Sequence, residues 1–141
     1  MNHNTWGMED NIQALTELLD RKNIAYARRE GAFVMLLPVD RGDLLDVKLS
    51  MTVRTTAICV NAYAPVTSLD TIQVGRLLNR MNCQQRRGIF QYDCDDGELR
   101  FTQFVSSNGE WAGDETVMNT IQAGIDAVCR LAEAVENELN G

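Results

Sequence analysis

The 141-residue sequence predicts an α+β fold, with an antiparallel β-sheet and three helices in the order α-β-β-β-β-α-β-β-α. Two observations lead to this prediction. In three stretches, apolar residues recur every three or four positions, as on one face of a helix. Between these stretches, apolar and polar residues alternate in short segments separated by tight turns, as in half-buried strands. The length suits a single domain over residues 1–141, in which residues 1–7 form a loose N-terminal lead.

The first half of the chain predicts one helix and four strands. The helix spans residues 8–22, because Glu9 suits the positive first turn of the helix dipole and Arg21 suits its negative last turn. Asn23 ends this helix. Strands are expected at residues 24–29, 33–39, 44–53 and 56–64.

The second and third of these strands are expected to form a hairpin around a turn at Arg41-Gly42. In that register, the core face of the hairpin carries Val34, Leu36, Pro38, Leu45, Val47 and Leu49. Successive side chains of a strand point to opposite faces of the sheet. We therefore expect Phe33, Met35 and Leu37 on the face away from the core.

The second half of the chain predicts a helix, a hairpin and another helix. The first helix begins after a cap at residues 67–68, and Asn82 stops it, because asparagine tolerates the left-handed conformation of a helix end. Asp96-Gly97 is typical of a type I′ hairpin turn, in which both central residues need positive φ. An apolar stripe at helical spacing over residues 114–139 predicts the last helix.

A two-residue turn at Asp96-Gly97 fixes the register of the second hairpin. It sets Asp93 opposite Arg100, as an exposed pair of opposite charges. The core face of this hairpin then carries Phe90, Tyr92, Cys94, Leu99 and Phe101, with Tyr92 opposite Phe101. Ile89 and Phe104 fall on the face away from the core.

The composition limits the kinds of partner. The net charge is −7, and from residue 93 onward eleven acidic residues stand against two basic ones, an excess that repels phosphate. The basic doublets Arg28-Arg29 and Arg86-Arg87 are more typical of solvated strand or loop ends than of a nucleic-acid site. No apolar run approaches the length of a membrane span, and the N-terminus does not resemble a secretory signal. We therefore expect a cytoplasmic protein that binds neither nucleic acid nor membrane.

The reactive residues form no pattern typical of catalysis or metal binding. The four cysteines have no C-x-x-C spacing, and His3 is the sole histidine, so no metal site is expected. The acidic residues around Gly97 do not match the ligand spacing of a calcium-binding loop. Cys83 is close to Arg86 and Arg87, cations that favour a thiolate, but the sequence offers no base to activate it. We therefore expect no enzymatic activity and no cofactor.

Three short segments resemble a known family: Leu78-Asn79-Arg80-Met81-Asn82, Gly88-Ile89-Phe90 and Asp96-Gly97-Glu98-Leu99-Arg100. Together with the order of elements, they resemble the YbjN-type family of bacterial proteins, which are proposed sensory transduction regulators. The resemblance is closest over residues 69–139, and the N-terminal half matches by topology. It implies a type III secretion chaperone-like fold and a cytosolic bacterial module that binds protein and often dimerises. It implies no catalytic residue.

The predicted function is therefore that of a non-enzymatic, protein-binding regulator or chaperone-like module. The residues expected to bind the partner lie on the face of the sheet away from the core: Phe33, Met35, Leu37, Ile89 and Phe104. The partner is another protein or a second copy of the chain, as in a homodimer. Two alternatives stay open: a helix or the loop around Trp111 covers these residues, or the protein is redox-sensing or thiol-dependent and acts through Cys83.

Overall fold

The computed structural model describes residues 5–41, 44–64, 70–93 and 95–138. Within them, three helices and a six-stranded antiparallel sheet follow the predicted order, which confirms the fold class. The elements are α1 (Met8–Arg21), β1 (Ala27–Arg29), β2 (Ala32–Arg41), β3 (Leu44–Val53), β4 (Ala57–Ala64), α2 (Thr71–Cys83), β5 (Ile89–Asp93), β6 (Glu98–Ser106) and α3 (Asp114–Glu138).

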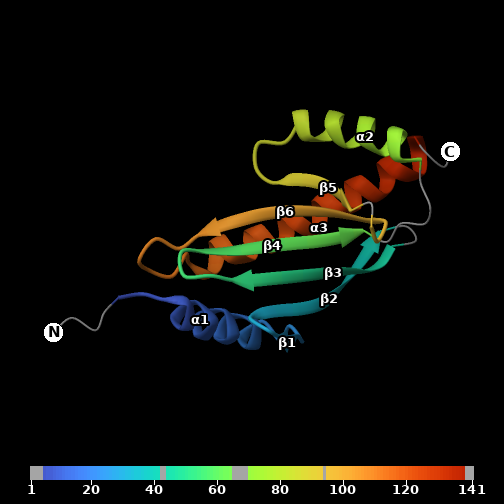
Figure 1. Cartoon of the computed structure of the whole chain (residues 1–141). Coiled ribbons are helices and arrows are strands. Elements are labelled where there is room, and N and C mark those ends of the chain that lie inside the picture. The colour runs from blue at the N-terminus through green and yellow to red at the C-terminus, as the bar shows by residue number, and fades with distance from the viewer. Residues whose placement is uncertain (1–4, 42–43, 65–69, 94, 139–141) are drawn as a thin grey trace.

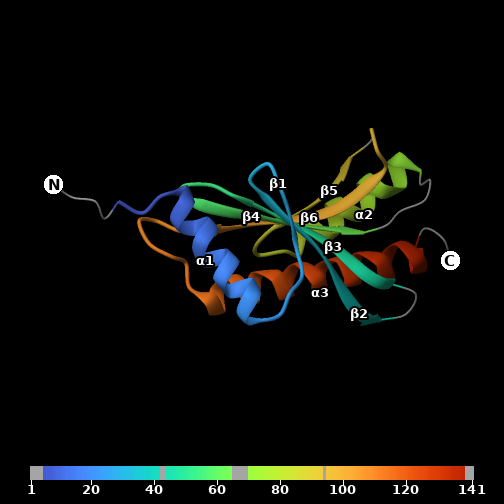
Figure 2. The same ribbon diagram turned by 90° about the horizontal axis from the view of Figure 1, so that it is seen from below.

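The strands lie in the order β1-β2-β3-β4-β6-β5, so the C-terminal hairpin joins the sheet through β6. Helices α1 and α3 lie on the same side of the twisted sheet, with α1 near β1 and β2 (Figures 1 and 2). Helix α2 lies along β5, at the opposite edge (Figure 1). The hydrophobic core fills the space between the sheet and these helices.

Helix α1 buries an apolar stripe against the sheet. Leu15, Leu18 and Leu19 are fully buried, as their helical spacing predicts. The carboxylate of Asp10 accepts a hydrogen bond from the Gly7 backbone N–H (2.8 Å) and so caps the first turn. Asn23 has a φ of 56° and ends the helix as predicted, because this left-handed residue lets the Ile24 N–H bond the Leu19 carbonyl (2.9 Å).

A buried asparagine ties α1 to two loops. The Asn11 side-chain amide donates hydrogen bonds to the carbonyls of Arg54 (2.8 Å) and Thr55 (3.2 Å), and to the Ser107 hydroxyl (2.9 Å). The Asn11 side-chain oxygen accepts one from the Trp6 indole N–H (2.7 Å). Every polar atom of this buried side chain is thus used, and the network fixes the start of α1 on the β3–β4 turn.

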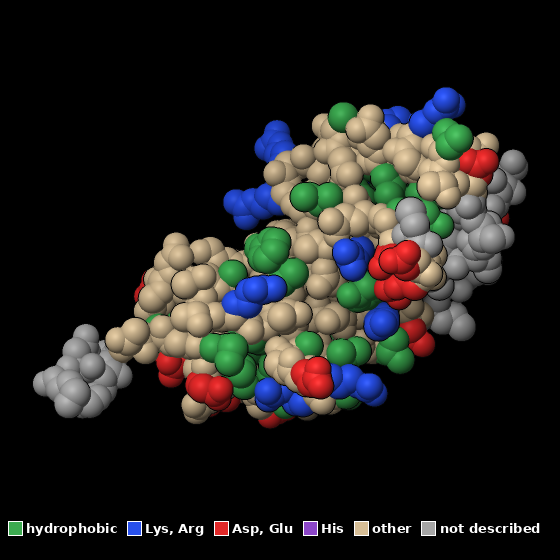
Figure 3. Space-filling view, in the orientation of Figure 1, with side chains coloured by type: hydrophobic (Ala, Val, Ile, Leu, Met, Phe, Trp, Pro, Cys, Tyr) green, Lys and Arg blue, Asp and Glu red, His purple; other side chains and the backbone are tan. Residues whose placement is uncertain are grey.

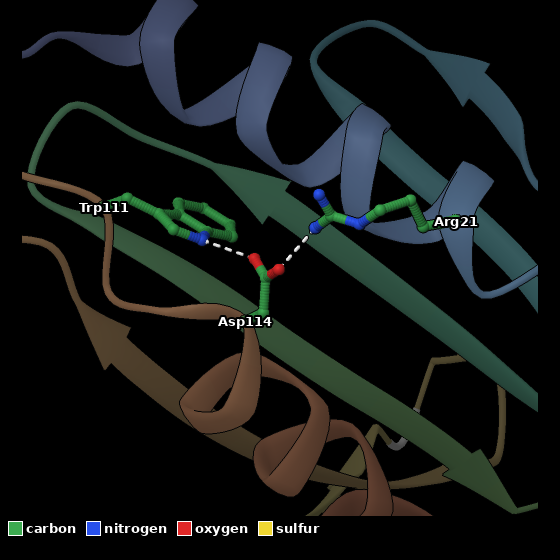
Figure 4. A network of polar contacts seen from close by, with 3 residues as sticks. All are labelled: Arg21, Trp111 and Asp114. Carbon is green, nitrogen blue, oxygen red and sulfur yellow. Dashed lines mark hydrogen bonds and ion pairs between the residues drawn. The ribbon is translucent and has the colours of Figure 1, made fainter.

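Asp114 joins the first turn of α3 to α1 (Figure 4). One of its carboxylate oxygens accepts a hydrogen bond from the indole N–H of Trp111 (2.8 Å), and the other pairs with the guanidinium of Arg21. Trp111 packs against the hydrophobic core, so its ring does not cover the face of the sheet that points away from the core. The three residues hold the loop before α3 beside the C-terminal end of α1.

The predicted register of the β2–β3 hairpin is wrong by one residue. Phe33 pairs with Met51, and Met35 pairs with Leu49, instead of with the polar residues between them. The register shifts between Pro38 and Arg41, as at a β-bulge, and a shift of one residue exchanges the two faces of a strand. Phe33 and Met35 are therefore core residues.

The predicted register of the β5–β6 hairpin is wrong by two residues. Tyr92 pairs with Leu99 instead of Phe101, and Gln91 takes the predicted place of Asp93 opposite Arg100. The connection spans residues 94–97, with Gly97 at a φ of 73°. Because the shift is even, every described side chain keeps its predicted face. Cys94 lies outside the described residues.

Side chains at the two ends of α2 fix the helix to the backbone around it. Asp70 caps α2, accepting hydrogen bonds from the N–H groups of Ile72 (2.9 Å) and Gln73 (3.2 Å), and the caps predicted at residues 67–68 lie outside the described residues. Asn82 does not end the helix, which continues to Cys83. Its side chain instead accepts from the Phe90 N–H (2.7 Å) and donates to the Phe90 carbonyl (3.0 Å), which fixes the start of β5 on the helix.

Candidate protein-binding face of the sheet

Within the described residues, no helix packs on the face of the sheet that points away from the core. We call it the outer face. Its side chains follow from the strand registers and include Val34, Leu36, Pro38, Lys48, Ser50, Thr52, Cys59, Asn61, Tyr63, Ile89, Gln91, Arg100, Thr102 and Phe104. Figure 3 shows this face, with hydrophobic side chains in separate groups between charged ones.

The large exposed apolar side chains of the outer face lie in two places. Ile89 is 55% exposed and Phe104 is 62% exposed. Because Ile89 pairs with Thr102, Phe104 is its diagonal neighbour on the same face. Leu36 is 65% exposed but lies on β2, three strand spacings from β6, or about 14 Å away.

The five residues predicted to bind a partner are not brought together. The structure places Ile89 and Phe104 on the outer face and exposes both, as expected. Phe33 and Met35 are buried on the opposite face, and Leu37 is half-buried against the same core. The prediction of Phe33, Met35 and Leu37 as surface residues is therefore wrong, because the one-residue register shift turns them inward. The same shift exposes Leu36, which sequence reasoning assigned to the core.

Polar side chains bridge the strands beside the apolar pair. The Thr102 hydroxyl donates a hydrogen bond to the side-chain oxygen of Asn61 (2.5 Å) across β4 and β6. The Arg100 Nε–H donates to the side-chain oxygen of Gln91 (2.9 Å) across β6 and β5. Arg100 thus has an amide partner in place of the predicted Asp93. These contacts fix the surface around Ile89 and Phe104.

Two ionisable groups of the outer face are affected by burial. Burial raises the pKa of the Cys59 thiol above its usual value, and the hydrogen bond from the Asn61 amide (3.7 Å) partly offsets this effect. Burial, with a smaller contribution from Glu98, raises the pKa of Tyr63. Both groups therefore stay neutral at pH 7. The Lys48 ammonium lies 4.7 Å from the centre of the Tyr63 ring and 3.9 Å from the Glu98 carboxylate.

The thiol alternative depends on one exposed cysteine. Cys83 is exposed at the C-terminal end of α2, whereas Cys59 and Cys129 are buried, and all three are free thiols. In the part of the chain that the structure describes, no three His, Cys, Asp or Glu side chains gather as metal ligands. No described helix is long and apolar enough to cross a membrane.

The two arginine doublets lie at opposite edges of the sheet. Arg28-Arg29 belongs to β1, and the guanidinium of Arg28 stacks 4.5 Å from the centre of the Phe33 ring. Arg86-Arg87 precedes β5, the other edge strand. Five strand spacings, about 24 Å, separate the two edges. The doublets therefore do not join into one basic surface.

Comparison with known proteins finds similarity among solved structures. No protein-family model matches the chain, and no curated protein matches it. Among solved structures, it is similar to the crystal structure of YbjN, "a putative transcription regulator from E. coli". The TM-score is 0.68 at 15% sequence identity, over 91% of this chain and 93% of the other. The chain therefore has the fold of YbjN, as the short segments around α2 and the second hairpin predict.

Proposed function

We propose that this protein is a non-enzymatic regulator that acts by binding protein through the β5–β6 end of its outer face. The observation that carries the proposal is the exposure of Ile89 and Phe104 side by side on a face that no described helix covers. Burying each of these side chains against a partner would gain about 1.5–3 kcal/mol. The likeness in fold to YbjN, described as a regulator, supports the regulatory part of the proposal.

The edge of β6 beside this apolar pair supports a peptide as the partner. β5 pairs with residues 98–102 of β6, whereas β6 continues to Ser106. Within the described residues, β6 from Gln103 to Ser106 therefore pairs with β4 on one side and has no strand beside it on the other. An extended segment could add to such an edge through main-chain hydrogen bonds while its side chains contact Ile89 and Phe104. This mode of binding is chaperone-like, because it holds an extended chain.

A second copy of the chain is the other partner that this surface suits. A twofold dimer would place the same apolar pair on both molecules, so that each pair contacts its equivalent or a neighbouring strand. Homodimerisation and capture of another protein share one set of residues in this proposal. A single pair of substitutions therefore tests both.

The test compares Phe104→Asp with Ile72→Asp. Ile72 is 68% exposed on α2, away from the outer face, so its substitution is a matched control. We expect the wild type to self-associate in sedimentation equilibrium, or to capture a protein from native cytosol. Phe104→Asp should abolish either property, while Ile72→Asp preserves it. A monomeric wild type that captures no protein would refute the proposal, as would equal losses in the two variants.

A further inference from the structure

A second feature lies on the other side of β6, where the core face of the sheet meets α3 and the connection between α2 and β5. A cleft of about 890 Å³ opens there. Its lining combines three arginines, one aspartate and several amide and hydroxyl groups over an apolar floor: Gln85, Arg86, Arg87, Phe101, Gln103, Thr116, Asn119, Thr120, Ala123, Asp126 and Arg130. This volume is in the usual range for a small-molecule site.

The cleft is positively charged in an acidic protein. Arg86, Arg87 and Arg130 line it, and none is within ion-pair distance of a described carboxylate. Asp126 is the one acidic residue of the lining, and its carboxylate accepts a hydrogen bond from Gln122 (3.0 Å). The lining thus carries a net charge of +2, whereas the whole chain carries −7. Figure 3 shows Lys and Arg side chains projecting beside the connection between α2 and β5.

Gln103 is a polar residue at a position of β6 whose side chain faces the core. On β6 it shares its face with Leu99, Phe101 and Val105, all of which are buried. Its side chain is half-buried and makes no hydrogen bond to a described residue. An amide that faces the cleft without a protein partner is available to bind a ligand.

The connection that carries Arg86 and Arg87 is fixed by its own contacts. Gln85 donates its backbone N–H to the Asn82 carbonyl (3.2 Å) and its side-chain amide to the Arg87 carbonyl (3.0 Å). Gly88 has a φ of 80° and lies against the Phe101 ring, where an added Cβ would come within 2.2 Å of the ring. The close approach needs glycine at this position, directly after the two arginines that line the cleft.

We propose that this cleft binds a small organic phosphate. Guanidinium groups bind phosphate oxygens in bidentate pairs, and three of them suit an anion that carries more than one charge. The amides and hydroxyls beside them suit the organic part of such a molecule, and Phe101 and Ala123 provide apolar contact. The long phosphate backbone of a nucleic acid fits less well, because the other arginine doublet lies at the far edge of the sheet and the C-terminal part of the chain is acidic.

The test is isothermal titration of ATP, without added metal, into the wild type, Arg130→Gln and Arg76→Gln. Arg76 is an exposed arginine of α2 that does not line the cleft, and its substitution removes the same charge. We expect Arg130→Gln to weaken ATP binding about tenfold or more, since a hydrogen bond to a charged group is lost. Arg76→Gln should leave binding within about twofold of the wild type, because the charge it removes is screened by salt.

The proposal would be overturned by no ATP binding at millimolar concentration, by equal weakening in both variants, or by failure of inorganic pyrophosphate to compete with ATP. Circular dichroism of each variant separates loss of binding from loss of fold. Changes in backbone amide chemical shift on addition of ATP should concentrate at residues 85–87, at Gln103 and at 119–130. Changes confined to other residues would contradict the assignment of the ATP site to the cleft. Phe104→Asp should retain ATP binding, so this test is independent of the proposed protein-binding face.

Discussion

The two hairpins β2–β3 and β5–β6 depart from the simplest turn in different ways. In β5–β6, the connection is two residues longer than a type I′ turn at Asp96-Gly97 requires, and the pairing moves by two positions. In β2–β3, the register shifts near Pro38 and the pairing moves by one position. The side-chain period of a strand is two residues. The even shift therefore preserves the core face, whereas the odd shift reverses it.

This difference decides which residues are available to a partner. Ile89 and Phe104 remain on the outer face under the even shift. Phe33 and Met35 move into the core under the odd shift, and Leu36 takes their place on the surface. A binding surface predicted from strand alternation is therefore correct only when the register is shifted by an even number of residues.

The largest expected effect comes from placing one charge in each hairpin. Met35→Asp would bury a carboxylate among apolar side chains without a partner, and we expect it to cost about 4 kcal/mol or more. Phe104→Asp places the same charge on an exposed site and should change the free energy of unfolding by less than about 1 kcal/mol. Urea denaturation followed by circular dichroism measures both. Similar losses of stability in the two variants would contradict the burial of Met35 and the exposure of Phe104.

The smallest expected effect concerns the polar pair opposite Arg100. A double-mutant cycle between Gln91 and Arg100 should give a coupling energy of about 0.2–1 kcal/mol, because these side chains are bonded across the hairpin. The same cycle between Asp93 and Arg100 should give a smaller coupling, since Asp93 pairs with Glu98. Stronger coupling of Asp93 than of Gln91 to Arg100 would favour the two-residue turn.

The sequence predicts most of the fold because the fold depends on local patterns. The apolar spacing of α1, the left-handed stop at Asn23 and the alternation over residues 44–53 are all local, and the structure confirms each of them. The strand order has no such local signal, because the pairing of β6 with β4 joins segments that are far apart in the chain.

The candidate sites were harder to predict. For the outer face, a register shift near Pro38 had no recognisable signal in the sequence. For the cleft, Arg86 and Arg87 precede β5 whereas Arg130 belongs to α3, and only the packing of α3 against the sheet brings the two segments together. Gln103 offered the one local signal, since it is a polar residue at a core position of an alternating strand. Such a residue indicates either a buried hydrogen bond or a binding site.

The two hairpin registers are tested most directly by measuring cross-strand contacts by NMR in the wild-type protein. The registers place Phe33 opposite Met51 and Gln91 opposite Arg100. Nuclear Overhauser effects between backbone protons of these partners are therefore expected in both hairpins. If Phe33 instead contacts Ser50, the register is the one predicted from the sequence, and Phe33 and Met35 lie on the outer face. That result would contradict the assignment of the protein-binding surface to Ile89 and Phe104 alone.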